Sequence, residues 1–426
     1  MIDVKLVRET PDAVEAALGR RADFRDAIKT IRQADERRRT ILQKVEALRA
    51  ERNVASEAIA RRKKAGEDAT DLLAGLKTTS GSIKALDQEI RGVDAELREA
   101  LLGIPNLPLD DVPVGDVTAN VIERTWGDIP EFAFKPKPHW ELGEQLGIFD
   151  LPRGAKISGS GFPVFTGQGA KLGRALVSFM LDVHTEEHGY REIAPPYLVN
   201  ADSALGTGQL PDLESNMYVT EDGLFLIPTA EVPVTNLHRD EILSHRQLPQ
   251  GYVAYTPCFR REAGAHGKDT RGLIRVHQFD KVELVRLCAP AESKNEHDAL
   301  LGHAETILQR LEIPYRVVVL ATGDLGFASA KTYDLEVWAS GVQQWLEASS
   351  ASTFTDFQAR RANIRYRPEG GGKPEFIHTL NASGVALPRT LIAILENNQE
   401  EGGSVRIPEV LVPYFGSERL TPDGQT

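Results

Sequence analysis

The chain has 426 residues, of which 41% are hydrophobic and 26% charged, and a net charge of −12. This composition is ordinary for a globular protein of two or three domains. No apolar run reaches 18 residues, and the N-terminal MIDVKLVRETPDAV lacks the apolar core of a signal peptide, so we expect no membrane span and no secretion. Two cysteines, Cys258 and Cys288, argue against a disulfide framework and against structural zinc, and favour a reducing, cytoplasmic location.

The charge is unevenly distributed along the chain. Residues 1–104 carry 21 Lys and Arg against 19 Asp and Glu, whereas the remainder carries 29 against 43. An acidic body with a slightly basic N-terminal region indicates that a polyanionic partner would meet the N-terminal region or a local cleft.

The first 24 residues are predicted to form a strand at Val4–Arg8 and a helix that opens at Thr10-Pro11. From about residue 26 the apolar side chains follow a heptad spacing, which indicates two helices of roughly 35 residues that pack along one seam. Gly66 is expected to form the turn between them and Asp71 to cap the second helix. Such an antiparallel hairpin would be roughly 50 Å long at 1.5 Å rise per residue. The seam residues are Ile31, Ala34, Ile41, Val45, Leu48, Ala55 and Ile59, then Leu72, Leu76, Ile83, Leu86, Ile90, Val93 and Leu97.

Two interpretations of this hairpin remain open. It is either a dimerisation coiled coil or a rigid arm that reaches a distant part of a large ligand. Basic side chains at its tip and along its faces would suit a phosphate backbone, although a basic run is more often only a solvated face. These candidate residues are Arg37, Arg38, Arg39, Arg49, Arg52, Arg61, Arg62, Lys63 and Lys64.

A proline-rich linker is expected at 105–135, between an N-terminal domain (1–104) and a second domain (136–426). The second domain opens with a glycine-rich turn region at 159–169, followed by a helix at about 170–188, a strand at 190–194 and Pro195-Pro196. Short strands then dominate, and helices are predicted near 231–239, 291–311 and 388–398. Antiparallel hairpins with packed helices indicate an α+β fold. The predicted strands are 224–227, 251–258, 272–279, 315–320, 332–338 and 344–349.

The segment PCFRREAGAHGKDTRGLIRVHQFDKVE (257–283) is the most informative stretch of the chain. It is predicted to form a strand, a long basic loop and a second strand. Arg side chains supply forked donors for phosphate oxygens, and glycines let backbone N–H groups approach them, so the loop is suited to a polyphosphate. No Walker-type phosphate loop occurs in the sequence.

This segment resembles motif 2 of class II aminoacyl-tRNA synthetases, in the form found in seryl-tRNA synthetases. Other segments match that family in the expected order: 159–196 resembles motif 1, a dimer-interface element; 226–231 contains the Thr-Ala-Glu loop; 321–338 and 345–352 match strands of the site; and 378–399 resembles motif 3. Leu346, Ala351, Ala382 and Pro388 depart from common family residues. The resemblance spans nearly the whole chain and implies a helical arm on a class II catalytic domain with an antiparallel sheet flanked by helices.

The resemblance also implies roles for individual residues. Catalytic roles fall on Arg260 at the α-phosphate and on Arg271 and Arg389 at the pyrophosphate end, and Glu262 would face the adenine amino group. Glu347 and Ser350 would hold Mg²⁺, for which a carboxylate and a hydroxyl are sensible ligands. The implied ATP-binding residues are Arg260, Arg261, Glu262, Val276, Phe279, Glu347, Ala348, Ser349, Ser350 and Arg389. The implied serine-binding residues are Thr229, Ala230, Glu231, Glu283, Asn381 and Ser383.

By this resemblance the chain is expected to be a homodimer that uses ATP and Mg²⁺ to join L-serine to tRNA(Ser), with tRNA(Sec) as a second acceptor left open. Two rivals are a paralogue that passes the activated amino acid to a non-tRNA acceptor and a non-catalytic RNA-binding or regulatory relative. The arm argues against the first, and the presence of Arg260, Glu262, Glu283, Glu347 and Arg389 argues against the second.

Overall fold

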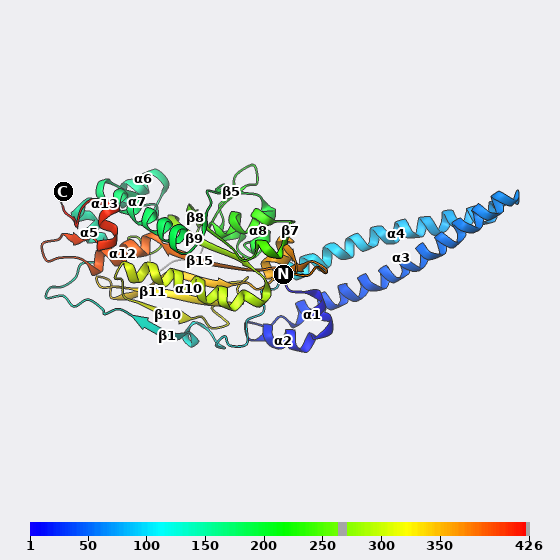
Figure 1. The fold of residues 1–426 in the computed structure, drawn as a ribbon, viewed down its shortest axis with the longest axis horizontal. Coiled ribbons are helices and arrows are strands. Elements are labelled where there is room, and N and C mark those ends of the chain that lie inside the picture. The colour runs from blue at the N-terminus through cyan, green and yellow to red at the C-terminus, as the bar shows by residue number, and fades with distance from the viewer. Residues whose placement is uncertain (263–270, 423–426) are drawn as a thin grey trace. The chain divides into compact units, whose positions relative to one another are not determined.

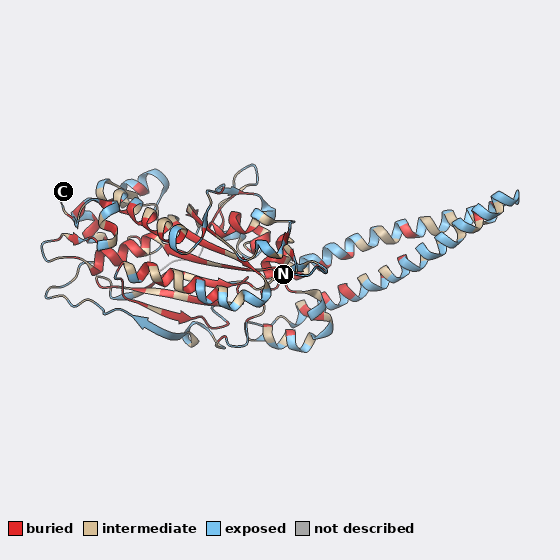
Figure 2. Ribbon diagram, in the orientation of Figure 1, coloured by how far each residue is buried: buried red, intermediate tan, exposed pale blue. Residues whose placement is uncertain are grey.

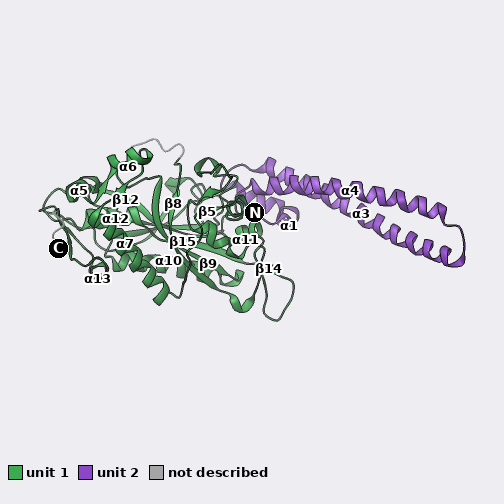
Figure 3. Cartoon of the chain, turned by 90° about the horizontal axis from the view of Figure 1, so that it is seen from above, with its two compact units in different colours: residues 1, 106–426 green, residues 2–105 purple. Residues whose placement is uncertain are grey.

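The computed structural model describes residues 1–262 and 271–422 and divides into two compact units. One unit contains Ile2–Pro105, and the other contains Met1 and Asn106–Thr426 (Figure 3). No helix in the described residues combines the length and apolar character that a membrane span requires.

Helices are the regular elements of the unit Ile2–Pro105 (Figure 1). Its helices are α1 (Val4–Glu9), α2 (Pro11–Gly19), α3 (Arg25–Ala65) and α4 (Thr70–Leu102). The predicted strand at Val4–Arg8 is wrong, because these residues form α1. The Asp3 side chain accepts a hydrogen bond from the Lys5 N–H at the helix start. On a strand Lys5 and Val7 would share a face, yet Lys5 is exposed and Val7 is buried, so burial does not follow the alternation of a strand.

Helices α3 and α4 pack as the predicted antiparallel hairpin. Ile31, Ala34 and Val45 of α3 and Ile83 and Val93 of α4 are among the buried seam residues, whereas the rest of the hairpin is largely exposed (Figure 2). Gly66 ends α3 with φ 72°, a left-handed conformation that favours glycine. Asp71 does not cap α4. It forms an ion pair with Arg62, and Asp68 accepts the Thr70 N–H instead.

The larger unit is built on an eight-stranded sheet in the order β1-β10-β11-β12-β15-β9-β8-β4. Every neighbouring pair is antiparallel except β4 and β8. The predicted α+β fold is therefore confirmed. The strands are β1 (Val121–Trp126), β10 (Tyr315–Val319), β11 (Lys331–Ala339), β12 (Gln344–Thr353), β15 (His378–Ala386), β9 (Gln278–Cys288), β8 (Gln250–Phe259) and β4 (Arg191–Glu192).

Three longer helices, α7 (Gly167–Asp182), α10 (Ser293–Arg310) and α12 (Leu387–Asn397), contribute to one large core with the sheet, whose strands are mostly buried (Figure 2). The remaining helices are α5 (His139–Leu146), α6 (Leu151–Ser158), α8 (Ala201–Thr207), α9 (Glu231–Thr235), α11 (Phe357–Ala362) and α13 (Val412–Phe415). The remaining strands are β2 (Phe149–Asp150), β3 (Val164–Phe165), β5 (Leu198–Val199), β6 (Phe225–Leu226), β7 (Ile242–Ser244), β13 (Arg365–Arg367), β14 (Glu375–Phe376), β16 (Val405–Arg406) and β17 (Arg419–Leu420).

Two segments of the larger unit also differ from the prediction. The stretch expected to be a linker contains β1, which forms an edge of the main sheet by pairing with β10. The strand predicted at 272–279 begins only at Gln278, because backbone N–H groups before Gln278 bond to partners outside the β8–β9 ladder. The Leu273 N–H donates to His139 Nε2 at 3.0 Å, and the His277 N–H donates to the Gly161 carbonyl at 2.8 Å. Gly161 has φ 81°, and a Cβ atom there would lie 2.5 Å from the His277 ring. The basic loop at 263–270 lies outside the described residues.

Candidate active site

Most of the predicted site residues line one cavity of about 680 Å³. Strands β9, β12 and β15, the residues that follow β8, the start of α12 and the segments 207–217 and 326–329 contribute to its walls. The predicted residues that line it are Thr229, Glu231, Arg260, Glu262, Glu283, Glu347, Ser350, Asn381, Ser383 and Arg389. A small adjoining cavity of about 50 Å³ shares five of these and adds Val276, Phe279 and Ala348.

One part of the cavity contains two buried carboxylates, Glu231 and Glu283. Glu283 Oε2 lies 2.6 Å from Lys281 Nζ, and Glu283 Oε1 accepts a hydrogen bond from Asn381 Nδ2 at 3.1 Å. Ser383 is the cross-strand partner of Glu283, so both side chains lie on the same face of the sheet. Burial raises the pKa of Glu283, and Lys281 opposes this shift. Burial, and then the charge of Glu283, raises the pKa of Glu231 to about 7.

Three arginines line another part of the same cavity. Arg260 donates from Nε to the Pro228 carbonyl at 3.3 Å, and its guanidinium lies 5.1 Å from the Phe279 ring centroid. Arg275 Nη1 pairs with Glu262 Oε2 at 2.5 Å. Arg389 donates from Nη1 to the Glu347 carbonyl at 2.6 Å. Guanidinium groups in this number suit the oxygens of a polyphosphate.

Glu347 and Ser350 both face the cavity because β12 contains a bulge. Residues three apart on a regular strand point to opposite faces. Here Glu347 pairs with Glu336 and Ser349 with Leu335, which leaves Ala348 without a partner and shifts the alternation by one residue. The bulge therefore places a carboxylate and a hydroxyl on one wall.

These two oxygen groups fit a hard cation such as Mg²⁺. Within residues 1–262 and 271–422, no group of three or more His, Cys, Asp or Glu side chains could hold a metal ion. Glu347 and Ser350 would therefore hold Mg²⁺ only with additional oxygens, such as those of a bound polyphosphate.

Four predicted residues line neither cavity. Ala230 is buried, and Ser349 donates its hydroxyl to the Ser383 carbonyl at 2.5 Å. Arg261 is exposed, and the guanidinium of Arg271 lies over the Trp140 ring, 4.5 Å from its centroid. Sequence reasoning placed Arg271 at the pyrophosphate end, but among the described arginines it is Arg275, four residues later, that joins Arg260 and Arg389 in the wall.

Two further residues near the carboxylates were also missed. Lys281 lies two residues before Glu283 on β9, so the strand alternation alone could have placed both on one face. Gln358 of α11 donates from Nε2 to Glu231 Oε1 at 2.6 Å. These two residues are 127 positions apart, and no local sequence pattern connects them.

Several basic residues of the helical hairpin contact acidic residues within the same unit. Arg37 pairs with Glu96, Arg38 with Asp94, Arg49 with Asp87 and Arg62 with Asp71. Exposed pairs of this kind contribute about 0–1 kcal/mol each, so they can open for a competing phosphate. In the described part of the chain, Arg52, Arg61, Lys63 and Lys64 form no ion pair.

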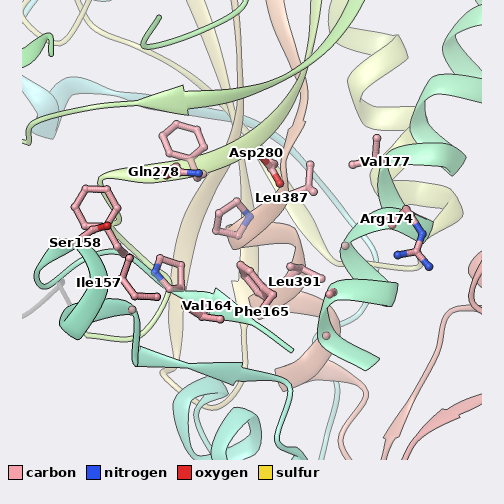
Figure 4. A pocket seen from close by; sticks show the side chains of 18 of the residues that line it. Ile157, Ser158, Val164, Phe165, Arg174, Val177, Gln278, Asp280, Leu387 and Leu391 are labelled. Carbon is pink, nitrogen blue, oxygen red and sulfur yellow. The ribbon is translucent and has the colours of Figure 1, made fainter. Parts of the chain in front are cut away.

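A second large cavity, of about 530 Å³, lies between α6, β3, α7, α12 and the start of β9 (Figure 4). Its lining is mainly apolar and includes Ile157, Phe165 and Leu391, with Arg174 and Asp280 as charged groups. Pro388 lines both this cavity and the small cavity beside Arg389. The first turn of α12 therefore separates the two spaces.

Comparison with known proteins identifies the family. Residues 1–108 match the model of the seryl-tRNA synthetase N-terminal domain, and residues 217–398 match the tRNA synthetase class II core domain (G, H, P, S and T). The chain is 54% identical to the serine–tRNA ligase of Gemmatimonas aurantiaca, over 98% of this chain and 99% of that protein. It is also 54% identical to the serine–tRNA ligase of Geobacter sulfurreducens, with the same coverage.

Solved structures agree with this assignment. The seryl-tRNA synthetase of Pyrococcus horikoshii complexed with ATP has a TM-score of 0.93 and 40% identity, covering 99% of this chain and 100% of the other. The cytoplasmic serine–tRNA ligase of Naegleria fowleri in complex with AMP has a TM-score of 0.88 and 29% identity, covering 99% of each chain. With the motif order and the cavity described above, these relationships show that the chain belongs to the seryl-tRNA synthetase family of class II aminoacyl-tRNA synthetases.

Proposed function

We propose that the chain activates L-serine with ATP and then transfers serine to the 3′ end of tRNA(Ser), releasing AMP. The observation that carries this proposal is the composition of the larger cavity. It combines two buried carboxylates, suited to an ammonium and a hydroxyl, with three arginines suited to a triphosphate.

The activation step joins one serine carboxylate oxygen to the α-phosphorus, while the bond from that phosphorus to the bridging oxygen of pyrophosphate breaks. No protein nucleophile is needed. The enzyme's task is to align the two reactants and stabilise the charge that develops at the α-phosphate. We propose that Arg260 stabilises that charge and that Arg389 and Arg275 bind the departing pyrophosphate. Glu262 is assigned to the adenine amino group, so its ion pair with Arg275 must open when ATP binds.

Serine recognition is assigned to the carboxylate end of the cavity. Glu231 and the Thr229 hydroxyl would accept the ammonium, and Glu283 with Ser383 and Asn381 would read the side-chain hydroxyl. A buried site of this kind rejects alanine, because its polar groups would be left without partners. The wall around the hydroxyl must exclude the extra methyl group of threonine.

Mg²⁺ would be held by Glu347 and Ser350 together with phosphate oxygens. When bound, the ion would neutralise charge on the triphosphate. Arg389, which contacts the Glu347 carbonyl, would orient the same phosphates from the neighbouring wall.

The helical hairpin is proposed to bind tRNA through its basic side chains, of which Arg61, Lys63 and Lys64 at the tip are exposed. A second copy of the chain is proposed to cover the apolar cavity beside α6 and α7, where Ile157 is 74% exposed and other apolar side chains line the wall (Figure 4). A cytoplasmic location is proposed because both cysteines are free and buried.

Serine-dependent exchange of pyrophosphate into ATP, followed by charging of tRNA, tests this function. Exchange without charging would support the paralogue with a non-tRNA acceptor. Absence of both activities in a folded dimer would support a non-catalytic relative.

A further inference from the structure

The side chain of Gln358 is fully buried and bonds to three separate segments. It donates from Nε2 to Glu231 Oε1 at 2.6 Å and to the Thr207 carbonyl at 3.1 Å, and its Oε1 accepts from the Thr379 hydroxyl at 2.6 Å. We propose that Gln358 is a positioning residue that holds the Glu231 carboxylate toward the ammonium of the substrate amino acid. This inference rests on the proposed serine-activating function.

The surrounding groups fix the orientation of the Gln358 amide. Thr379 donates its hydroxyl proton to Oε1, and the Thr207 carbonyl accepts from Nε2. A flipped amide would place two acceptors together at Thr207 and would direct its oxygen at the Glu231 carboxylate. The amide therefore presents an N–H group to Glu231, which must act as the acceptor.

This donor matters because Glu231 lies in an unfavourable setting for a charge. Burial and the neighbouring Glu283 raise the pKa of Glu231 to about 7, while Gln358, Lys281 and Arg260 oppose the shift. Gln358 is the first of these opposing groups and, unlike Lys281, which pairs with Glu283, it contacts Glu231 directly. A hydrogen bond to the charged form favours that form. The ionised carboxylate is the state that attracts an ammonium.

The replacement Gln358→Met keeps a side chain of similar length and removes the donor. We expect the KM for serine in pyrophosphate exchange to rise at least tenfold, on the scale of a hydrogen bond to a charged group. The KM for ATP should stay within about twofold. The pH at which serine binding becomes half-maximal should move upward, because the carboxylate loses a group that stabilises its charge.

Two variants separate positioning from general packing. Thr379→Val leaves Gln358 in place but removes one of the three partners that hold its amide, so we expect a smaller change in the same direction. Gln309→Met is a control for loss of an amide donor outside the site, because the exposed Gln309 bonds to the Tyr315 hydroxyl and lines neither cavity of the site. It should leave the serine KM, the ATP KM and the pH profile unchanged.

The readouts are exchange kinetics from pH 6 to 9, calorimetric titration with L-serine and thermal unfolding. An unchanged serine KM in folded Gln358→Met would overturn the inference, as would equal rises in the serine and ATP KM values. If Gln358→Met does not fold, the same criteria apply to Thr379→Val. Wild-type protein that shows no serine-dependent exchange would contradict the proposed function itself, which distinguishes that failure from failure of the positioning role.

Discussion

Lys281 Nζ lies 2.6 Å from Glu283 Oε2, and both side chains are almost completely buried. The two residues are separated by one position on β9, so they share a face of the sheet. A buried carboxylate without a partner is costly, and Lys281 supplies the compensating charge. Asn381 donates a hydrogen bond to the other carboxylate oxygen of Glu283. Glu283 is therefore held by two neighbours at the wall of the cavity.

We expect Glu283→Gln to raise the serine KM far more than the ATP KM. The amide keeps the shape of the side chain but loses the charge and one acceptor, and it leaves Lys281 without its ion-pair partner. Exchange kinetics with each substrate varied in turn measure the effect. Glu187→Gln, which removes a surface carboxylate paired with Arg310, is the matched control. Equal effects on both substrates would instead assign Glu283 a structural role.

Lys281→Met tests the same pair through stability. Removing the cation leaves a buried carboxylate unpaired, and loss of one partner from a buried pair costs about 3–5 kcal/mol. Urea unfolding at pH 8 should show this loss, whereas Lys331→Met, which breaks a pair with the exposed Asp111, should cost less. A loss below that of Lys331→Met would show that Glu283 does not depend on Lys281.

Arg260→Ala should lower the rate of pyrophosphate exchange by two or more orders of magnitude, the scale of losing one charge-stabilising donor. The fold should survive, because Arg260 lines a cavity and lies outside the hydrophobic core. Arg261→Ala is a neighbouring control, since Arg261 does not line either cavity of the site. Near-normal exchange in a folded Arg260→Ala protein would contradict the proposed role of Arg260 at the α-phosphate.

Arg275 and Arg271 are predicted to differ. Arg275 lines the cavity beside Glu262, whereas Arg271 stacks on Trp140. Arg275→Ala should raise the KM for ATP and lower exchange at least tenfold, and Arg271→Ala should have a smaller effect. Pyrophosphate-exchange kinetics of the two variants, measured in parallel, test this difference. A larger effect of Arg271→Ala would favour Arg271 as the residue that binds pyrophosphate.

Features that depend on residues close together in the sequence could be predicted, whereas features that depend on contacts between distant segments could not. The spacing of Ile31, Ala34 and Val45 predicted the hairpin seam, because helical periodicity is a local property. The shared face of Glu347 and Ser350 was not predictable from spacing, since it depends on a bulge that the partner strand defines. The contact between Gln358 and Glu231 depends on the tertiary fold alone. At Val4–Arg8 an apparent alternation competed with the Asp3 cap, and the helix formed.

The buried His184 and the partly buried His303 predict a pH dependence of stability. Burial lowers the pKa of His184 to about 3 and that of His303 to about 4, below the ordinary value of 6.5. The unfolded chain therefore binds more protons than the folded one as the pH falls below about 6.5, so this contribution to stability is lost between pH 6.5 and the folded pKa. Relative to His184→Gln, the wild type should lose about 1–2 kcal/mol of stability between pH 8 and pH 5. Urea unfolding at pH 8 and pH 5 measures this difference. An equal change in the free energy of unfolding for wild type and His184→Gln would contradict a neutral His184 in the folded protein.

Deleting residues 36–97 and joining the ends with a short Gly linker tests the role of the hairpin. Serine-dependent exchange should remain, because every cavity residue lies in the other unit, and charging of tRNA should be largely lost. Neutralising Arg61, Arg62, Lys63 and Lys64 should weaken tRNA binding less than the deletion and reduce its salt dependence by roughly one unit of slope per lost phosphate contact. Light scattering gives the size of the deletion protein, and a monomer that lacks both activities would identify the hairpin as a dimerisation element.

Charging of tRNA(Ser) with labelled amino acid by the wild-type protein tests the central claim most directly. The account predicts ATP-dependent formation of seryl-tRNA, with alanine and threonine accepted far less efficiently, because Glu283 and its buried neighbours are proposed to read the hydroxyl and the site is proposed to exclude a further methyl group. No transfer of serine to tRNA by a folded protein that binds ATP would contradict it.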